Sequence, residues 1–221
     1  MYGVIVAEEK ELDEALKILS DVKETTFKGK VFYEGKVGNK EVVIVRSSIG
    51  KVNSALTCQM LIDKYDVKMV FNIGSSGSVD NSLDIGDVVV ASKLVQHDFD
   101  VTGFGRQLGE IEGIGIYIEA NPKLLELFKD KDVKIGCIAS GDKFVSDIND
   151  KNFIRETFGA LCVEMEGASV AQVCLLNNVD FLVIRSISDK LDGSSKIEFP
   201  KFLEYSSKKA AEILSYVLGE L

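Results

Sequence analysis

The sequence predicts an α/β protein with a three-layer α/β/α fold and a mixed, mostly parallel central sheet. One observation behind this prediction is a series of short apolar runs, rich in Val and Ile and bounded by polar or glycine residues, as buried strands are. Another is that segments with apolar residues at helical spacing lie between these runs. Alternating strands and helices form a largely parallel sheet covered on both faces, which binds ligands at the carboxyl ends of its strands.

The predicted elements follow each other along the whole chain. The strands are Gly3–Val6, Val42–Val45, Met69–Ile73, Val88–Ala91, Ile135–Ala139 and Phe181–Ile184. The helices include the apolar sets within Leu12–Leu19, Ala55–Leu61, Leu124–Phe128 and Val170–Leu176, and a closing amphipathic helix within Phe199–Leu221. Two alternating segments flank Gly38 and Asn39, which predicts a β-hairpin formed by Val31–Val37 and Glu41–Val45.

The composition is that of one globular domain spanning residues 1–221. The chain is 46% hydrophobic, and its two prolines and even charge distribution leave no candidate linker or repeat. With 26 basic and 35 acidic residues, the net charge of −9 disfavours binding to nucleic acid or to an anionic membrane surface. A small or neutral ligand fits this charge better.

The four cysteines lie in apolar stretches and form no C-x-x-C pair, which indicates buried thiols in a reducing compartment. The segment Met1–Ala7 lacks a basic leader and a small-residue cleavage site. No apolar run approaches the ~20 residues needed to span a bilayer. We therefore expect a cytoplasmic protein.

Two polar segments follow the first and third predicted strands. Ala7–Glu11 is either an acid-rich first turn of a helix or the source of a carboxylate that acts as a base on water, and the segment alone does not decide. Asn72–Ser78 is predicted to be a glycine-rich turn whose amides could approach a ligand, which is a weak signal. It lacks the GK[ST] ending of a P-loop and the G-x-G-x-x-G pattern, which weakens nucleotide-triphosphate and dinucleotide interpretations.

Two further segments place acids at strand ends. Val163–Ala168 carries Glu164 and Glu166 after a buried strand, where unpaired carboxylates are costly, although a pair of acids at a helix N-terminus is the simpler alternative. Arg185–Asp189 ends the last apolar strand, and Asp189 either caps the next element or serves as a general acid in a closed, apolar pocket.

Together these segments resemble the nucleoside phosphorylase/hydrolase superfamily, and within it the 5'-methylthioadenosine/S-adenosylhomocysteine nucleosidases. The resemblance extends over essentially the whole chain through A-x-x-x-E, S-x-I-G-K, N-x-G-S-x-G, H-D-x-D-V-T-x-F-G, S-G-D-x-F, V-E-M-E and R-x-I-S-D, at Ala7–Glu11, Ser47–Lys51, Asn72–Gly77, His97–Gly105, Ser140–Phe144, Val163–Glu166 and Arg185–Asp189. It implies a nucleoside-phosphorylase-like fold and a hydrolase that releases adenine from both nucleosides, in methionine salvage and methyl-cycle recycling.

The resemblance also implies a role for three carboxylates. Asp189 matches the acid that protonates adenine at N7, Glu11 matches the base for the attacking water, and Glu166 matches the residue that binds the ribose hydroxyls. Cleavage of the C1'–N9 bond develops positive charge on the sugar and negative charge on the base, so both need compensation. A dry pocket would favour the protonated form of the acid.

The remaining implied site residues bind the substrate, and no metal or cofactor is implied. They are Met165, Gly77, Val145, Phe144, Ile49, Ser75, Arg185, Ser188 and Phe199. The family is homodimeric, so we expect a homodimer in which Val101 and Phe104 enter the partner's pocket. For the single His97, a structural hydrogen bond is favoured over catalysis.

Two rival functions share this fold. A purine nucleoside phosphorylase needs arginines to bind phosphate, and this chain has Asn72 where the related phosphorylases carry one; Arg46 and Arg185 keep this alternative open. A non-catalytic nucleoside-binding protein would lack an acid or base, whereas all three carboxylates are present here. The sequence leaves open the preference among the two thio-nucleosides, 5'-deoxyadenosine and futalosine.

Two charged residues depart from the family pattern. Glu8 stands where well-known members carry Met beside the 5'-thio group, and Arg106 stands where they carry Tyr in a mobile loop. We hypothesise that this pair favours the amino-acid tail of S-adenosylhomocysteine over the methyl group of methylthioadenosine.

Overall fold

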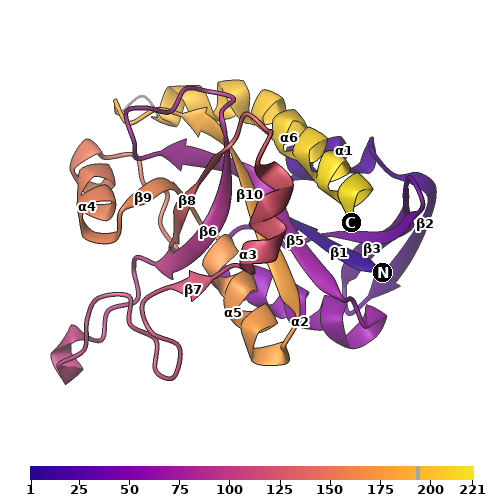
Figure 1. The fold of residues 1–221 in the computed structure, drawn as a ribbon, viewed down its shortest axis with the longest axis horizontal. Helices are drawn as coiled ribbons and strands as arrows, with labels where there is room; N and C mark the ends of the chain where they lie inside the picture. The colour runs from indigo at the N-terminus through magenta and orange to yellow at the C-terminus, as the bar shows by residue number, and fades with distance from the viewer. Residues whose placement is uncertain (193–194) are drawn as a thin grey trace.

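The computed structural model describes residues 1–192 and 195–221 and has the predicted α/β architecture (Figure 1). Its strands are β1 (Tyr2–Val6), β2 (Ser20–Phe27), β3 (Lys30–Val37), β4 (Lys40–Arg46), β5 (Met69–Ser78), β6 (Val88–Gln96), β7 (Ile118–Glu119), β8 (Lys134–Ser140), β9 (Ala160–Glu164) and β10 (Asp180–Asp189). Its helices are α1 (Glu9–Leu16), α2 (Lys51–Tyr65), α3 (Pro122–Leu125), α4 (Ile148–Phe158), α5 (Gly167–Asn177) and α6 (Ser195–Glu220), with 3-10 turns η1 (Thr102–Phe104) and η2 (Glu126–Phe128).

Helices cover both faces of the sheet, each face with its own apolar core. On one face α2 and α5 bury Leu61 and Ala171 against the strands. On the other face α1, α6 and the α3–η2 segment bury Leu12, Leu214 and Phe128. Each fully buried Leu or Phe side chain stabilises the fold by roughly 1.5–3 kcal/mol, so these two layers hold the sheet from both sides.

The sheet is mixed, as predicted, and part of it closes on itself. In the described chain its order is β10-β6-β8-β9-β5-β1-β4-β3-β2, and β10 also pairs with β5, so that β5, β9, β8, β6 and β10 form a ring. Five pairings are parallel and five antiparallel, because the hairpin strands, β7 and the two junctions β5–β9 and β6–β10 add antiparallel pairs. The ring brings the ends of β5, β9 and β10 together.

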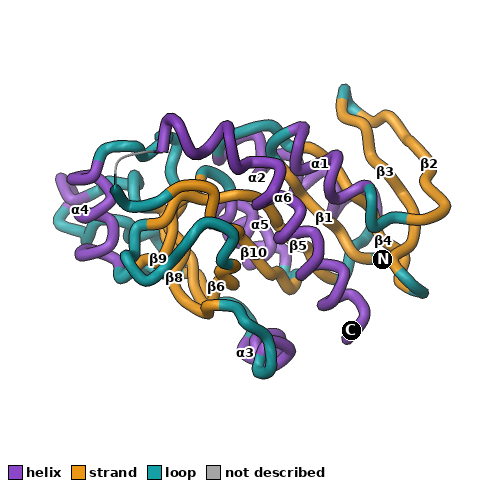
Figure 2. The backbone as a smooth tube through the Cα atoms, turned by 90° about the horizontal axis from the view of Figure 1, so that it is seen from above, coloured by secondary structure: helices purple, strands orange, loops and turns teal. Residues whose placement is uncertain are grey.

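The predicted hairpin is confirmed as β3 and β4, which pair in antiparallel register. The elements without a clear sequence signal include β2 and α4, besides the two-residue strand β7. Strand β2 is polar and mostly exposed, and it extends the sheet at the edge beyond β3 (Figure 2). Helix α4 buries few apolar side chains, although Asp147 caps its start and Gly159 ends it in the left-handed conformation.

The glycine-rich segment Asn72–Ser78 was wrongly predicted to be a turn, because its residues continue β5 and pair with β10. Glycine is required there for close approach. A Cβ atom on Gly74 would lie 2.5 Å from Glu11 Oε1, and one on Gly77 would lie 2.8 Å from Asp189 Oδ2. The glycines therefore make room along the strand for side chains of other elements.

The closing helix is confirmed, but α6 begins at Ser195, earlier than predicted, with Pro200 inside it. Across residues 1–192 and 195–221, no helix combines the length and apolar character needed to cross a membrane.

Candidate active site

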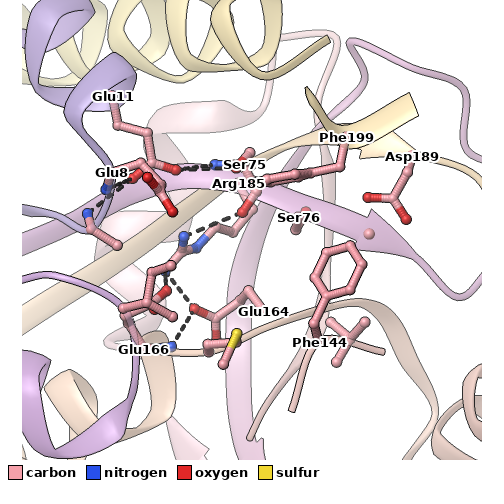
Figure 3. A pocket seen from close by; sticks show the side chains of 15 residues that line it. Glu8, Glu11, Ser75, Ser76, Phe144, Glu164, Glu166, Arg185, Asp189 and Phe199 are labelled. Carbon is pink, nitrogen blue, oxygen red and sulfur yellow. Dashed lines mark hydrogen bonds and ion pairs between the residues drawn. The ribbon is translucent and has the colours of Figure 1, made fainter. Parts of the chain in front are cut away.

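One cavity of about 370 Å³ lies at the carboxyl ends of β1, β5, β9 and β10. Figure 3 shows the side chains that line it. They come from residues far apart in the chain: Ala7, Glu8, Glu11, Ile49, Ser75, Ser76, Gly77, Phe144, Val163, Glu164, Met165, Glu166, Arg185, Asp189 and Phe199. The three carboxylates singled out in the sequence thus share a cavity, at the strand ends where the fold class predicts a site.

Glu11 is buried in the first turn of α1 and its carboxylate accepts four hydrogen bonds. Oε2 accepts from the backbone N–H groups of Ala7 and Glu8, at 2.9 and 3.0 Å. Oε1 accepts from the backbone N–H and the hydroxyl of Ser75, at 2.9 and 3.1 Å. A carboxylate has about four acceptor positions, so Glu11 is rigidly placed, and the rotatable Ser75 hydroxyl is the donor that a water molecule can most easily replace.

Arg185 is buried at the centre of the acidic end of the pocket. Its Nη2 contacts Glu164 Oε2 and Asn72 Oδ1, and lies 3.4 Å from Glu166 Oε2. Its Nη1 donates to the carbonyl of Ser75 at 3.3 Å. One guanidinium therefore lies beside two carboxylates directly, with Glu11 nearby, and the excess of negative charge suits a ligand that develops positive charge.

Glu164 was not among the predicted site residues, but it holds this end of the pocket together. Its Oε2 accepts from the backbone N–H groups of Glu166 and Gly167, at 2.9 and 2.7 Å, at the start of α5. Its Oε1 contacts the hydroxyl of Ser140. Because all these partners are buried, Glu164 orients Glu166 and Arg185 and has no free acceptor turned to the ligand. The V-E-M-E pattern was the available signal, since it placed two acids at one strand end.

Glu166 is a buried carboxyl group with a strongly raised pKa. Desolvation by burial raises the pKa of Glu166 to about 8, opposed by Arg185 and reinforced by Glu164. Its Oε1 accepts from the backbone N–H of Gly50 at 2.9 Å. A carboxyl in this state can either accept from or donate to a hydroxyl group of a bound ligand.

Asp189 lies at the other end of the cavity, away from Glu11 and Glu166 (Figure 3). Its Oδ1 accepts from the hydroxyl of Ser188 at 3.0 Å, and its Oδ2 lies 2.9 Å from Lys151 Nζ. The expectation of a closed, apolar surrounding for this group is therefore incomplete, because a buried ammonium contacts it. Lys151 had no sequence signal, since the polar segment around it belongs to none of the predicted elements.

Two aromatic rings form the wall beside Asp189. Phe144 and Phe199 pack edge to face, with centroids 5.6 Å apart and an angle of 66° between the rings. Phe144 is 46% exposed and open toward the cavity. A smaller adjoining hollow is lined by Val145 together with Gly77, Met165 and Asp189. This end offers flat apolar surface beside the carboxyl group of Asp189, which suits a planar heterocyclic base.

Four predicted site residues do not line this cavity. Val145 lines only the adjoining hollow, and Ser188, Val101 and Phe104 line neither. Ser188 lies behind the cavity, and its hydroxyl donates to the carbonyl of Ser76 at 3.1 Å as well as contacting Asp189. Val101 and Phe104 lie at η1, on the segment between β6 and β7 that projects from the body in Figure 1. The ring of Phe104 is 86% exposed.

The predicted charged pair Glu8 and Arg106 is not brought together within the chain. Glu8 lines the cavity beside Glu11, and burial together with the charge of Glu11 raises the pKa of Glu8. Arg106 lies on the projecting segment and pairs with Glu110 and Glu112, at 3.1 and 3.2 Å.

Comparison with known proteins places this geometry in a family. The family model described as "Phosphorylase superfamily" matches residues 1–219. The chain is 36% identical to the 5'-methylthioadenosine/S-adenosylhomocysteine nucleosidase of Staphylococcus haemolyticus, over 100% of both chains. The enzyme of that name from Helicobacter pylori with butyl-thio-DADMe-Immucillin-A has a TM-score of 0.96 and 39% identity, covering 100% of this chain and 98% of the other. Futalosine hydrolase of Helicobacter pylori has a TM-score of 0.94 and 39% identity, covering 100% and 97%. The chain belongs to the 5'-methylthioadenosine/S-adenosylhomocysteine nucleosidases of the phosphorylase superfamily.

Proposed function

We propose that the protein hydrolyses the N-glycosidic bond of 5'-methylthioadenosine and S-adenosylhomocysteine, releasing adenine and the thioribose product. The observation that carries this proposal is the shared cavity, which has an acidic end around Glu11 and Glu166 and an aromatic end around Asp189. The reaction develops positive charge on the sugar and negative charge on the base, so its two ends need different surroundings. The activity serves methionine salvage and the recycling of the methyl cycle.

Each carboxylate has a proposed role that fits its contacts. Asp189 protonates adenine at N7, so that the base leaves as a neutral molecule. Glu11 accepts a proton from the attacking water once the Ser75 hydroxyl turns away from it. Glu166 binds the ribose hydroxyls, and the negative charge around Arg185 stabilises the oxocarbenium-like sugar.

The charge of the acidic end supports water rather than phosphate as the nucleophile. A phosphate dianion needs free cationic donors. Arg185, however, is already engaged by Glu164 and Glu166, and Asn72 donates to the carbonyl of Ile5 at 3.1 Å. A dianion placed here would face Glu11 and Glu164, beside the carboxyl group of Glu166, so phosphorolysis is disfavoured.

A homodimer is part of the proposal. Exposed apolar side chains occur on α2, at Val52 and Leu56, and on the projecting segment, at Phe104. In the proposed dimer, Val101 and Phe104 of one protomer reach the pocket of the other, near Ile49. Light scattering at working concentrations checks this assembly, and a monomer would contradict it.

Product analysis with and without phosphate tests the proposed reaction. Hydrolysis gives the free 5'-thioribose in both conditions, whereas a sugar 1-phosphate that forms only with phosphate would assign the protein to the phosphorylases. The same assay with futalosine and 5'-deoxyadenosine compares kcat/KM among the candidate substrates. No base release from any of the four would favour a non-catalytic binding protein.

A further inference from the structure

Helix α4 contributes a fully buried ammonium group to the back of the aromatic end. Lys151 Nζ donates to Asp189 Oδ2 at 2.9 Å and to the carbonyl oxygen of Lys190. Both side chains of the ion pair are almost completely shielded from solvent, at 0% and 3% exposure. A lysine is almost never buried to this extent unless it is paired, so the Lys151–Asp189 contact is a built feature of the site.

The other charged groups around this contact have partners of their own. Lys143 pairs with Asp150 at 2.6 Å, on the loop before α4 and on α4 itself. From α6, Glu198 accepts from the backbone N–H of Lys190 at 2.8 Å. From β9, Glu164 pairs with Arg185. The ammonium of Lys151 is therefore the charge that acts on Asp189 most directly.

We propose that Lys151 is a positioning residue that holds Asp189 as a carboxylate in the empty pocket, so that the acid acquires its proton from solvent only when adenine binds. This inference rests on the proposed role of Asp189 in the hydrolysis. An opposite charge within hydrogen-bonding distance favours the ionised form of a carboxyl. The lone pair of adenine N7 favours the protonated form, because two acceptors cannot share a contact without a proton.

The proton balance closes over one turnover. One proton enters from solvent onto Asp189 as the nucleoside binds. As the C1'–N9 bond breaks, its electron pair stays with adenine and the proton of Asp189 forms the N7–H bond. The water oxygen bonds to C1', and the proton it loses passes through Glu11 to solvent. Asp189 is then again a carboxylate facing Lys151.

The pH profile of kcat/KM tests this role, because kcat/KM reports the ionisation of the free enzyme. Lys151→Met removes the cation and keeps an unbranched side chain of similar length. Lys151→Met takes away the charge that favours the carboxylate form, so the alkaline decline of kcat/KM moves to higher pH. Lys151→Arg keeps the cation and retains the profile of the unmodified enzyme.

Proton uptake on binding gives a second readout that does not depend on catalysis. Calorimetry with a non-cleavable adenosine analogue, in two buffers of different ionisation enthalpy, measures the protons taken up per site at a pH well below 8, where Glu166 already carries its proton. Lys151→Met takes up fewer protons than the unmodified enzyme. If Lys151→Met does not fold, Lys151→Gln, which keeps a donor for the carbonyl of Lys190, replaces it.

Two results for Lys151→Met would overturn the inference. One is an alkaline decline of kcat/KM at the same pH as in the unmodified enzyme, together with unchanged proton uptake. The other is an equal loss of kcat/KM at every pH, which a purely structural role of Lys151 would give. If the unmodified enzyme hydrolyses the nucleosides and requires Asp189, these results overturn only the role of Lys151. If it hydrolyses none of them, the proposed function fails as well.

Discussion

The two ends of the cavity are built on different principles. At the acidic end, Glu11, Glu164 and Arg185 are held by numerous buried hydrogen bonds from the backbone and from each other. At the aromatic end, Asp189 has two side-chain partners, and Phe144 remains partly exposed. A rigid set of charges can stabilise a cationic sugar without reorganising. At the aromatic end, the ammonium of Lys151 and the hydroxyl of Ser188 are the side-chain partners of Asp189, which fits its proposed role in proton delivery to adenine.

The largest expected effect on turnover comes from replacing Asp189, the proposed acid. Asp189→Asn preserves the shape of the group but has no proton to give, so kcat falls by roughly 10²- to 10⁴-fold, while an adenosine analogue still binds. Single-turnover kinetics and analogue titration measure the two quantities. Nearly normal turnover in this variant would mean that the aromatic end does not supply the proton, which would contradict the proposed difference between the two ends of the cavity.

Breaking the buried ion pair at the acidic end lowers the stability of the fold. Glu164→Gln leaves Arg185 without its closest counter-charge, and breaking a buried ion pair costs about 3–5 kcal/mol in the free energy of unfolding. Glu126→Gln, at an exposed ion pair with Lys129, is the matched control and costs about 0–1 kcal/mol. Denaturant unfolding compares them, and equal costs would mean that the buried network does not stabilise the fold.

The raised pKa of Glu166 predicts how stability depends on pH. A raised folded-state pKa means that the folded protein binds this proton more tightly than the unfolded chain does, so the contribution of Glu166 to stability falls as pH rises from about 4.5 to about 8. Glu166→Gln removes this dependence.

The free energy of unfolding of Glu166→Gln relative to the unmodified protein should therefore increase by more than about 1 kcal/mol across this window and level off above it. Unfolding at several pH values measures the difference. A constant difference, or one that decreases with pH, would contradict the assignment.

The smallest expected effect is a change in substrate preference caused by replacing Glu8. Because Glu8 lines the cavity and Arg106 does not, we expect Glu8→Met to lower the preference for S-adenosylhomocysteine over methylthioadenosine by roughly two- to fivefold in kcat/KM, the size of an exposed charge interaction. The variant Arg106→Ala tests the hypothesis that Glu8 and Arg106 act together on the amino-acid tail. Equal efficiency on the two substrates in the unmodified enzyme and in Arg106→Ala would dismiss the paired hypothesis.

The sequence predicted structure where apolar residues formed a regular pattern or where a charged residue would be costly to bury. Apolar runs located the buried strands, and acids at strand ends marked segments where buried carboxylates would need a reason. The choice of Glu11, Glu166 and Asp189 within those segments came from the family resemblance. Strand β2 was missed because an exposed edge strand needs no apolar run. Lys151 was missed because only the fold reveals that a lysine on a polar helix points inward. The homodimer and the cytoplasmic location stay predictions.

The closed ring of strands has a consequence for how the protein is made. Strand β10 pairs with both β5 and β6, so the ring lacks its final member until residues 180–189 have left the ribosome. Until then Glu164 has no Arg185 to neutralise it, and the nascent chain exposes the edges of two apolar strands. Completion of the ring and assembly of the cavity are thus a single late event, and a truncated chain ending before β10 is expected to aggregate and to lack the cavity.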